Sequence, residues 1–256
     1  MIDPTALVAS DVRIGDNVRI DAYATVEDDV EIGNNSHIGS HSVIRSHTRM
    51  GEGNRVHEFA VIGGEPQSVH YQGEATGLRI GDNNTIREFV TISRGTASDR
   101  GVTTIGDDNY LMAYVHVGHD CDIGNNCVFV NGTNIAGHVC VGDYAFLSGF
   151  TMIHQSCRIG THCMTGINTI LRQDVAPFVT VNGNPARSIA INSRGLSRRG
   201  FSQQSISALS KVFKLFFRKN VKLEKLPEAL DAGTREDACV RVLLEFLGST
   251  ERGVVR

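Results

Sequence analysis

The chain has 256 residues, of which 41% are hydrophobic, and a formal net charge of −3 at pH 7. This charge gives no sign of a bulk nucleic-acid-binding surface, and no apolar stretch approaches the roughly 20 residues that a membrane-spanning helix needs. The first residues, from Met1 to Pro4, carry neither a basic segment nor a hydrophobic one, so we expect a cytoplasmic protein without a secretory signal or stable membrane insertion.

From the N-terminus to about residue 171, an aliphatic or similar side chain recurs at every sixth residue. The first uninterrupted run is Val8, Ile14, Ile20, Val26, Ile32, Ile38, Ile44, Met50, Val56 and Ile62. A period of six fits neither a helix of 3.6 residues per turn nor a plain alternating strand. It is typical of a hexapeptide parallel β-helix, in which short strands form the faces of a prism and the aliphatic residues stack into one core. Glycines such as Gly15 and Gly33 follow the aliphatic positions and are expected to supply the backbone angles of the corners.

Four of the six cysteines fall two residues before an aliphatic position, where the repeat carries small side chains. They are Cys121, Cys127, Cys157 and Cys163. In such an inward slot cysteine behaves as a small hydrophobe. Because no CxxC pair is present either, the cysteines do not predict a zinc site.

Two segments interrupt the repeat, at residues 63–77 and 93–104. The first is rich in glycine and contains Pro66, and the second shifts the register of the repeat by one residue. Both are predicted to be loops that leave the prism. Loops on a rigid scaffold are frequent carriers of function.

The six-residue pattern fades after Leu171, and apolar residues take up helical spacing from Phe201 onward. Ser202 is a plausible N-cap for the first helix, a second helix is expected after Leu223 and a third from about Thr234. The sequence therefore predicts an all-β domain at residues 1–186 and an α-helical C-terminal domain at 187–256 that covers the last coils.

Four histidines gather on one edge of the predicted prism. Three hexads make one coil of about eighteen residues, so Val117, Ile135 and Ile153 stack in one column. The histidines that follow or precede this column are His116, His119, His138 and His154. The loop at 93–104 leaves the prism beside His119 and would cover this edge.

Three interpretations of the histidine edge remain open from the residues alone. A neutral imidazole suits the abstraction of a hydroxyl proton, and Asp120 follows His119 as a carboxylate that could orient the ring. Stacked imidazoles could instead bind zinc between subunits, although their irregular offsets disfavour a symmetric metal site. Alternatively, the histidines only decorate an outer corner.

The run HVGHDCDIGNNCVFVNGTNIAGHVCVGDYAFLSG within residues 111–149, followed by IHQSCRIG at 153–160, resembles UDP-N-acetylglucosamine acyltransferases, which catalyse the first step of lipid A biosynthesis. The resemblance extends to HYQGE at 70–74, IREFVTISRGT at 86–96, NGNPA at 182–186 and RRGF at 198–201. Hexapeptide repeats alone are shared by many acyltransferases, whereas this ordered set of motifs is specific.

The resemblance implies a left-handed β-helix, a homotrimer with active sites between adjacent prisms, and no metal or other cofactor. The implied reaction transfers a (R)-3-hydroxyacyl chain from acyl carrier protein to the 3-hydroxyl of the glucosamine of UDP-N-acetylglucosamine. His119 is implied as the general base with support from Asp120, and the peptide N–H of Gly137 as the oxyanion donor.

The resemblance also implies the residues that contact the substrates. Substrate-binding positions are His70, His116, His138, His154 and Gln155, with Asn192, Arg198 and Arg199 on the nucleotide side, where arginine can bind phosphate bidentately. Ile167 falls where the acyl groove of the family ends. A branched side chain there fills space, so a medium-length acyl chain is expected.

The sequence departs from the family pattern at four positions. Ser68 and His70 stand where an Asp and a Lys are usual, Ser93 where a His is common, and Arg194 in place of a Glu. All four lie on the sugar-nucleotide side of the implied site. They leave open a paralogue that acts on a 3-amino UDP-sugar; a hexapeptide transferase that uses acetyl-CoA, a metal-dependent hydratase and a purely structural β-helix are the weaker alternatives.

Overall fold

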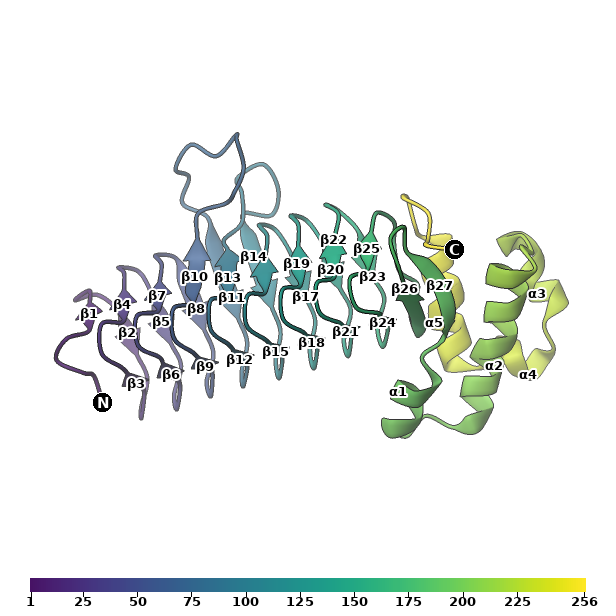
Figure 1. The fold of residues 1–256 in the computed structure, drawn as a ribbon, viewed down its shortest axis with the longest axis horizontal. Coiled ribbons are helices and arrows are strands. Elements are labelled where there is room, and N and C mark those ends of the chain that lie inside the picture. The colour runs from purple at the N-terminus through teal and green to yellow at the C-terminus, as the bar shows by residue number, and fades with distance from the viewer.

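The computed structural model describes residues 1–256, which form an elongated prism of short strands with a helical cap at its C-terminal end (Figure 1). Through β25 the chain visits three sheets in rotation, so that strands three positions apart in the chain pair in parallel, whereas β26 and β27 at the end of the prism depart from this order. The fold is the parallel β-helix that the six-residue repeat predicts.

The first sheet has nine strands: β1 (Leu7–Val8), β4 (Thr25–Val26), β7 (Val43–Ile44), β10 (Val61–Gly64), β13 (Thr91–Ser93), β16 (His116–Val117), β19 (Asn134–Ile135), β22 (Met152–Ile153) and β25 (Ile170–Leu171). The second has eight: β2 (Arg13–Ile14), β5 (Glu31–Ile32), β8 (Thr48–Met50), β11 (Gly77–Ile80), β14 (Val102–Ile105), β17 (Asp122–Ile123), β20 (Cys140–Val141) and β23 (Arg158–Ile159). The third has ten: β3 (Arg19–Ile20), β6 (His37–Ile38), β9 (Arg55–Val56), β12 (Thr85–Ile86), β15 (Tyr110–Leu111), β18 (Val128–Phe129), β21 (Phe146–Leu147), β24 (Met164–Thr165), β26 (Val179–Asn182) and β27 (Arg187–Ile191).

Most hexads consist of a two-residue strand and a four-residue corner. The second strand residue points inward, as Val117 does, and stacks on its partner in the next coil, Ile135. Successive coils therefore build one continuous core, which extends into the C-terminal helices and comprises 56 buried residues in all. The inward cysteines at 121, 127, 157 and 163 are fully buried in it, as the small slot of the repeat predicts.

The corner glycines have a different role from the one expected. The left-handed backbone angles occur three residues after the aliphatic position, at residues such as Asn35, Asp120 and His138. Gly33 is not left-handed, but a Cβ on it would lie 2.4 Å from the carbonyl carbon of Gly51 in the next coil. Glycine is required at this position because adjacent coils approach closely, and not because the backbone turns there.

Two loops project from the same side of the prism (Figure 1). They connect β10 to β11 and β13 to β14. Strands β10 and β13 end at Gly64 and Ser93, and strands β11 and β14 begin at Gly77 and Val102, so these four residues belong to the strands and not to the loops. The loops contact each other through Arg94, whose Nη2 donates to the Tyr71 hydroxyl at 2.6 Å. Both loops leave the corner between the first and second sheets.

The β-structure continues past residue 186. The Gly-Asn-Pro-Ala segment is the turn of an antiparallel hairpin between β26 and β27, so the first helix begins at Ser193. The helices are α1 (Ser193–Arg198), α2 (Gln203–Phe213), α3 (Leu226–Ala229), α4 (Ala232–Glu236) and α5 (Ala238–Gly248), with a π-helical turn at Lys214–Arg218 and a 3₁₀ turn at Leu223–Lys225. The hydroxyl of Ser202 caps α2 as expected, by accepting from the N–H of Ser205 at 3.0 Å.

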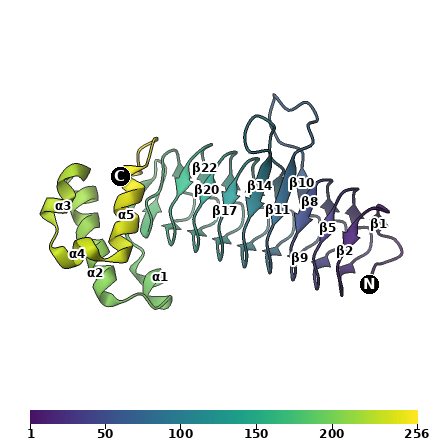
Figure 2. The same ribbon diagram turned by 180° about the vertical axis from the view of Figure 1, so that it is seen from behind.

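Helix α5 lies beside the last coils, as Figure 2 shows from behind. Arg158 of β23 donates to the Ser249 carbonyl at 2.9 Å and stacks on the Phe246 ring. The helical segment is thus fixed to the end of the prism. None of the helices combines the length and the apolarity that a membrane crossing requires.

Candidate functional site

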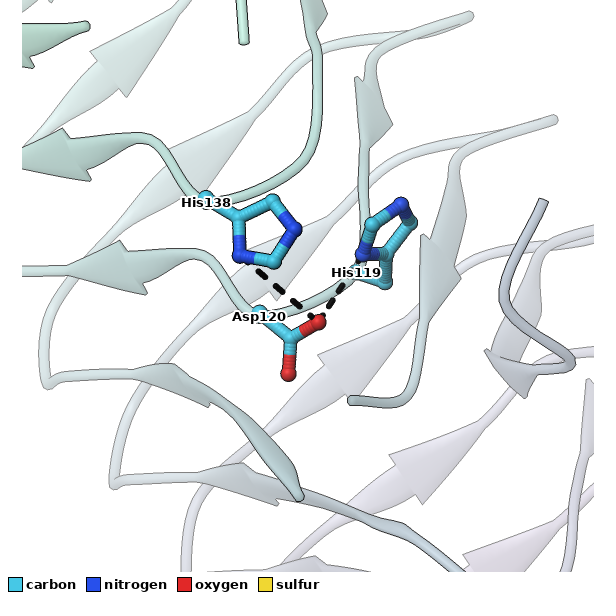
Figure 3. Close-up of side chains that lie close together, drawn as sticks. All are labelled: His119, Asp120 and His138. Atoms are coloured by element: carbon cyan, nitrogen blue, oxygen red, sulfur yellow. Dashed lines mark hydrogen bonds and ion pairs between the residues drawn. The ribbon is translucent and has the colours of Figure 1, made fainter. Parts of the chain in front are cut away.

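The corner between β16 and β17 carries a carboxylate–imidazole pair (Figure 3). The Nδ1 atom of His119 lies 2.9 Å from Oδ2 of Asp120, whose side chain is fully buried. Because an ionised carboxylate can only accept, Nδ1 of His119 carries a proton in this hydrogen bond. In the neutral ring, Nε2 is then left with its lone pair.

Asp120 is held by the loop between β13 and β14. The backbone N–H of Thr96 donates to Oδ1 of Asp120 at 2.9 Å, and the Thr96 hydroxyl donates to Oδ2 at 2.7 Å. The N–H of Asp120 in turn donates to the hydroxyl of Thr103 at 2.8 Å. These bonds fix both oxygens of the carboxylate, so that the orientation of the His119 ring is fixed as well.

A groove of about 450 Å³ opens beside His119. Gln67 of the first loop lies on one side, and residues of three successive coils form the floor. Its other lining residues are His116, Gly118, His119, Asn134, Ile135, Ala136, Gly137, Met152, Ile153 and Gln155. The groove therefore combines polar groups around His119 with apolar side chains one and two coils further on.

Gly137 lies directly against the His119 ring. A Cβ at this position would meet Cε1 of His119 at 2.6 Å and Nε2 at 2.8 Å, so a larger residue would displace the imidazole. Gly137 is buried, and its peptide N–H has no acceptor within the chain. By contrast, the N–H groups of Asp107 and Asn125, in another corner, each donate to a side-chain oxygen of the next coil at 2.7 Å. The Gly137 N–H is thus free to bind a ligand atom.

His116 and His138 flank this pair. His138 lies one coil further on, with its ring centroid 4.9 Å from that of His119 in an edge-to-face arrangement, and its Nδ1 lies 2.5 Å from Oδ2 of Asp99. His116 shares a 2.8 Å hydrogen bond with the hydroxyl of Thr91. Burial and the neighbouring His119 lower the pKa of His116, which favours the neutral form of this ring.

His154 and Gln155 lie on the same edge, a further coil away. Gln155 lines the groove, whereas the exposed His154 has its Nδ1 3.3 Å from a guanidinium nitrogen of Arg252 near the C-terminus. The structure therefore brings His116, His119 and His138 together and leaves His154 at the margin.

The other expected site residues lie elsewhere on the same chain. Asn192 is buried, caps α1 and donates to the carbonyl of His162, while the guanidinium of Arg199 stacks on Tyr144 at the corner between the second and third sheets. Arg198 lines a separate groove of about 760 Å³, whose cationic residues are Arg194, Arg198, Lys211 and Lys214. Ile167 is 73% exposed at the corner between the third and first sheets, and His70 is exposed in the first loop. Within one chain, none of these residues lines the groove beside His119.

The His119 corner has the composition of a possible metal centre. The ligand atoms of His119, Asp120 and His138 lie within 4.8 Å of one another. A metal ion bound through the Nδ1 atoms would have to replace their protons, which serve here in hydrogen bonds to carboxylates. A second group, His57, Glu58 and Glu88, is already engaged, because Arg87 binds both oxygens of Glu88.

Two residues of this site were not singled out in the sequence. Thr96 and Asp99 both belong to the loop between β13 and β14, and they contact residues 24 and 39 positions further along the chain. Counting in coils places residues of the prism but not those of a loop. The only sequence signal was the expected position of the loop beside His119.

Comparisons with known proteins find relatives that match the whole chain. The model for domain 2 of Udp N-acetylglucosamine O-acyltransferases matches residues 174–255, and the model for bacterial transferase hexapeptides matches 11–46, 29–64 and 103–137. An acyl-[acyl-carrier-protein]–UDP-N-acetylglucosamine O-acyltransferase of Thiobacillus denitrificans is 46% identical over 255 residues, covering 100% of this chain and 99% of the relative. Its counterpart from Paraburkholderia phymatum is 48% identical over 259 residues, covering 100% and 99%.

Solved structures give the same result. The UDP-N-acetylglucosamine acyltransferase of Francisella novicida superimposes with a TM-score of 0.95 at 36% identity, covering 100% of this chain and 94% of that one. The enzyme from Bacteroides fragilis superimposes with a TM-score of 0.97 at 35% identity, covering 100% of both chains. These matches confirm the expected left-handed β-helix with its helical C-terminal part.

Proposed function

Because this chain belongs to the family of acyl-[acyl-carrier-protein]–UDP-N-acetylglucosamine O-acyltransferases and is therefore an acyltransferase, we propose the substrates and residues of its reaction. It transfers a (R)-3-hydroxyacyl chain from acyl carrier protein to the 3-hydroxyl of the glucosamine of UDP-N-acetylglucosamine, the first step of lipid A biosynthesis. The observation that supports this most directly is the Asp120–His119 pair beside the unpaired N–H of Gly137 in one groove.

His119 is the general base of this reaction. Its Nε2 takes the proton of the sugar hydroxyl while the hydroxyl oxygen attacks the thioester carbonyl carbon. Asp120 stabilises the imidazolium that forms, because its carboxylate accepts from Nδ1. A positioned base of this kind contributes about 10²- to 10⁴-fold to the rate.

The peptide N–H of Gly137 binds the oxyanion of the tetrahedral intermediate. A fixed peptide dipole needs no reorganisation when the negative charge develops, and such a donor contributes about 10²- to 10³-fold. When the intermediate collapses, the carbon–sulfur bond breaks and the proton passes from His119 to the thiolate of the carrier. The products are the ester and a free carrier thiol, which balances the reaction without a cofactor.

The active enzyme is a homotrimer whose sites are completed by neighbouring chains. The residues proposed for the nucleotide, Asn192, Arg198 and Arg199, and the proposed groove end at Ile167 lie away from the corner that carries His119. A second copy of the chain can present these surfaces to the groove, which a single chain leaves open.

Ile167 limits the acyl chain to medium length. Each methylene that cannot be buried forfeits about 0.8 kcal/mol, so a donor two carbons too long is discriminated against. Replacing Ile167 with Gly should shift the preference toward longer donors. An unchanged length optimum in kcat/KM across a donor series would exclude Ile167 from this role.

The acceptor is tested by crossing UDP-N-acetylglucosamine and its 3-amino analogue with carrier proteins that bear different acyl chains. The 3-amino sugar is the second candidate because four departures from the family pattern fall on the sugar-nucleotide side, among them Arg194 in the groove of Arg198. Higher kcat/KM for the hydroxyl acceptor supports the proposal. A preference for the amine assigns the chain to the paralogous reaction.

A further inference from the structure

We propose that Asp99, in the loop between β13 and β14, is a positioning residue that acts on the acyl transfer through His138. The inference rests on the proposed function and deepens it, because it adds a second carboxylate–imidazole pair to the one formed by Asp120 and His119. Asp99 itself does not line the groove beside His119.

The contact between Asp99 and His138 is short and specific. Oδ2 of Asp99 lies 2.5 Å from Nδ1 of His138, within the distance at which the carboxylate accepts a charge-assisted hydrogen bond from the ring. Since the carboxylate accepts, Nδ1 of His138 carries a proton, and Nε2 is left free for a substrate group. Asp99 therefore determines the tautomer and the direction in which His138 presents its second nitrogen.

No other carboxylate lies within hydrogen-bonding distance of Nδ1 of His138. The nearest alternative, Oδ2 of Asp120, is 3.9 Å from Nδ1 of His138, and it already accepts from His119 and from the Thr96 hydroxyl. The rings of His138 and His119 also pack edge to face, at an interplanar angle of 89°. A His138 ring without its acceptor could rotate and would then alter the contacts of the base.

The loop places Asp99 through two anchors, one on each side of it. Thr96 donates twice to the carboxylate of Asp120. Arg100 donates to Oδ2 of Asp122 at 3.1 Å and to the carbonyl of Cys121 at 3.2 Å. Both anchors lie on the coil that carries His119, and Asp99 reaches from them to the next coil. The Asp99–His138 contact thus does not depend on the prism alone.

A merely structural role for Asp99 would look different. The Asp99 side chain is 40% exposed, and exposed ion pairs contribute little to folding stability. The Asp99→Ala variant should therefore keep its assembly and its melting temperature. A loss of activity with unchanged stability would come from the site.

A double-mutant cycle on the full-length assembled protein tests the proposal. kcat and KM for both substrates are measured for the wild type, Asp99→Ala, His138→Ala and the double variant. We expect Asp99→Ala to lower kcat/KM by about tenfold, the effect of one charge-assisted hydrogen bond. The loss should fall on the same kinetic parameter that His138→Ala changes, and the double variant should be no slower than His138→Ala. Equal losses in both backgrounds would overturn the proposal.

Two control variants separate orientation from loop order. Asp99→Asn retains an amide oxygen that can accept from Nδ1, so it should recover most of the activity lost in Asp99→Ala. Arg100→Ala removes the other anchor without touching His138 and should have a smaller effect. If Arg100→Ala lowered kcat/KM as much as Asp99→Ala does, the order of the loop and not the Asp99 carboxylate would be responsible for the loss of activity.

A spectroscopic readout is independent of the assayed reaction. In ¹⁵N-histidine-labelled protein, the His138 signals are identified by their loss in His138→Ala. The neutral ring should carry its proton on Nδ1 in the wild type and shift toward the Nε2–H form in Asp99→Ala. An unchanged tautomer would overturn the inference even if the substrates were correct, whereas a wild type inactive on both acceptors would overturn the proposed function alone.

Discussion

The orientation of the His119 ring depends on a carboxylate that accepts from three donors. Asp120 accepts from the His119 ring and from the N–H and hydroxyl of Thr96. Its backbone is left-handed, with φ of 58°, which an Asp tolerates better than most residues. The side chain of Asp120 therefore cannot turn away from His119 without breaking bonds to the loop. The ring of His119 is therefore fixed by its neighbours before any substrate binds.

A different histidine, His162, is expected to make the folding stability of the protein depend on pH. His162 lies between Tyr144 and Phe178 in a column of stacked rings, and its Nδ1 is buried without a partner. Burial and the nearby Arg199 lower the pKa of His162 from its ordinary 6.5 to about 4. The unfolded chain thus binds a proton at His162 in a pH range where the folded chain does not. Stability from the neutral ring is present above pH 6.5 and is lost as the pH falls toward 4.

Replacing His162 with Phe should reduce this acid sensitivity. Phe150 and Phe178 adopt the same left-handed backbone at equivalent corner positions, so the ring should fit the column. The apparent melting temperature is measured between pH 7 and 4 for the wild type and the variant. The variant should lose less of its stability over this range. Equal losses in the two proteins would show that His162 does not titrate as its burial implies.

At the scale of the elements, the close contact between coils limits which residues the corners accept. The three atoms nearest to a Cβ on Gly33 would all be backbone atoms of Gly51 and Glu52, at 2.4 to 2.7 Å. These backbone atoms cannot move unless the whole coil shifts. The Gly33→Ala variant should therefore lose about 1–3 kcal/mol of unfolding free energy, as overpacked sites do.

Gly64→Ala is the matched control for this substitution. Gly64 has no left-handed backbone, and the nearest atom to its Cβ would be 3.8 Å away, in ordinary contact. Its unfolding free energy should stay within about 0.5 kcal/mol of the wild type. Chemical denaturation of both variants decides the point; a Gly33→Ala variant as stable as Gly64→Ala would mean that the coils can separate at little cost.

The repeat predicts the prism well because each six-residue period corresponds to one strand and one corner of the prism. An inward residue at every sixth position fixes each strand, each column and the place of the inward cysteines. The hairpin at Asn182–Arg187 was missed because Gly, Asn and Pro mark both a domain exit and a tight turn. Asp99 could not be predicted, since its contact with His138 depends on the path of a loop without periodicity.

At the scale of the whole molecule, the homotrimer is proposed because residues assigned to the same site lie far apart on a single chain. Three chains of 27.8 kDa give a mass of about 83 kDa, which light scattering or sedimentation should report. Mixing His119→Ala with chains that carry Arg198→Ala should restore some activity if each site combines residues of two copies. A stable and active monomer would exclude a site shared between chains.

The reaction of the assembled protein is tested most directly by following both products with purified components. Incubation with UDP-N-acetylglucosamine and (R)-3-hydroxyacyl carrier protein should release one free carrier thiol for every 3-O-acyl sugar nucleotide formed. The His119→Ala variant, with unchanged assembly and melting temperature, should be slower by at least about 10²-fold. Near-normal turnover in His119→Ala, while His138→Ala is inactive, would contradict the assignment of His119 as the base.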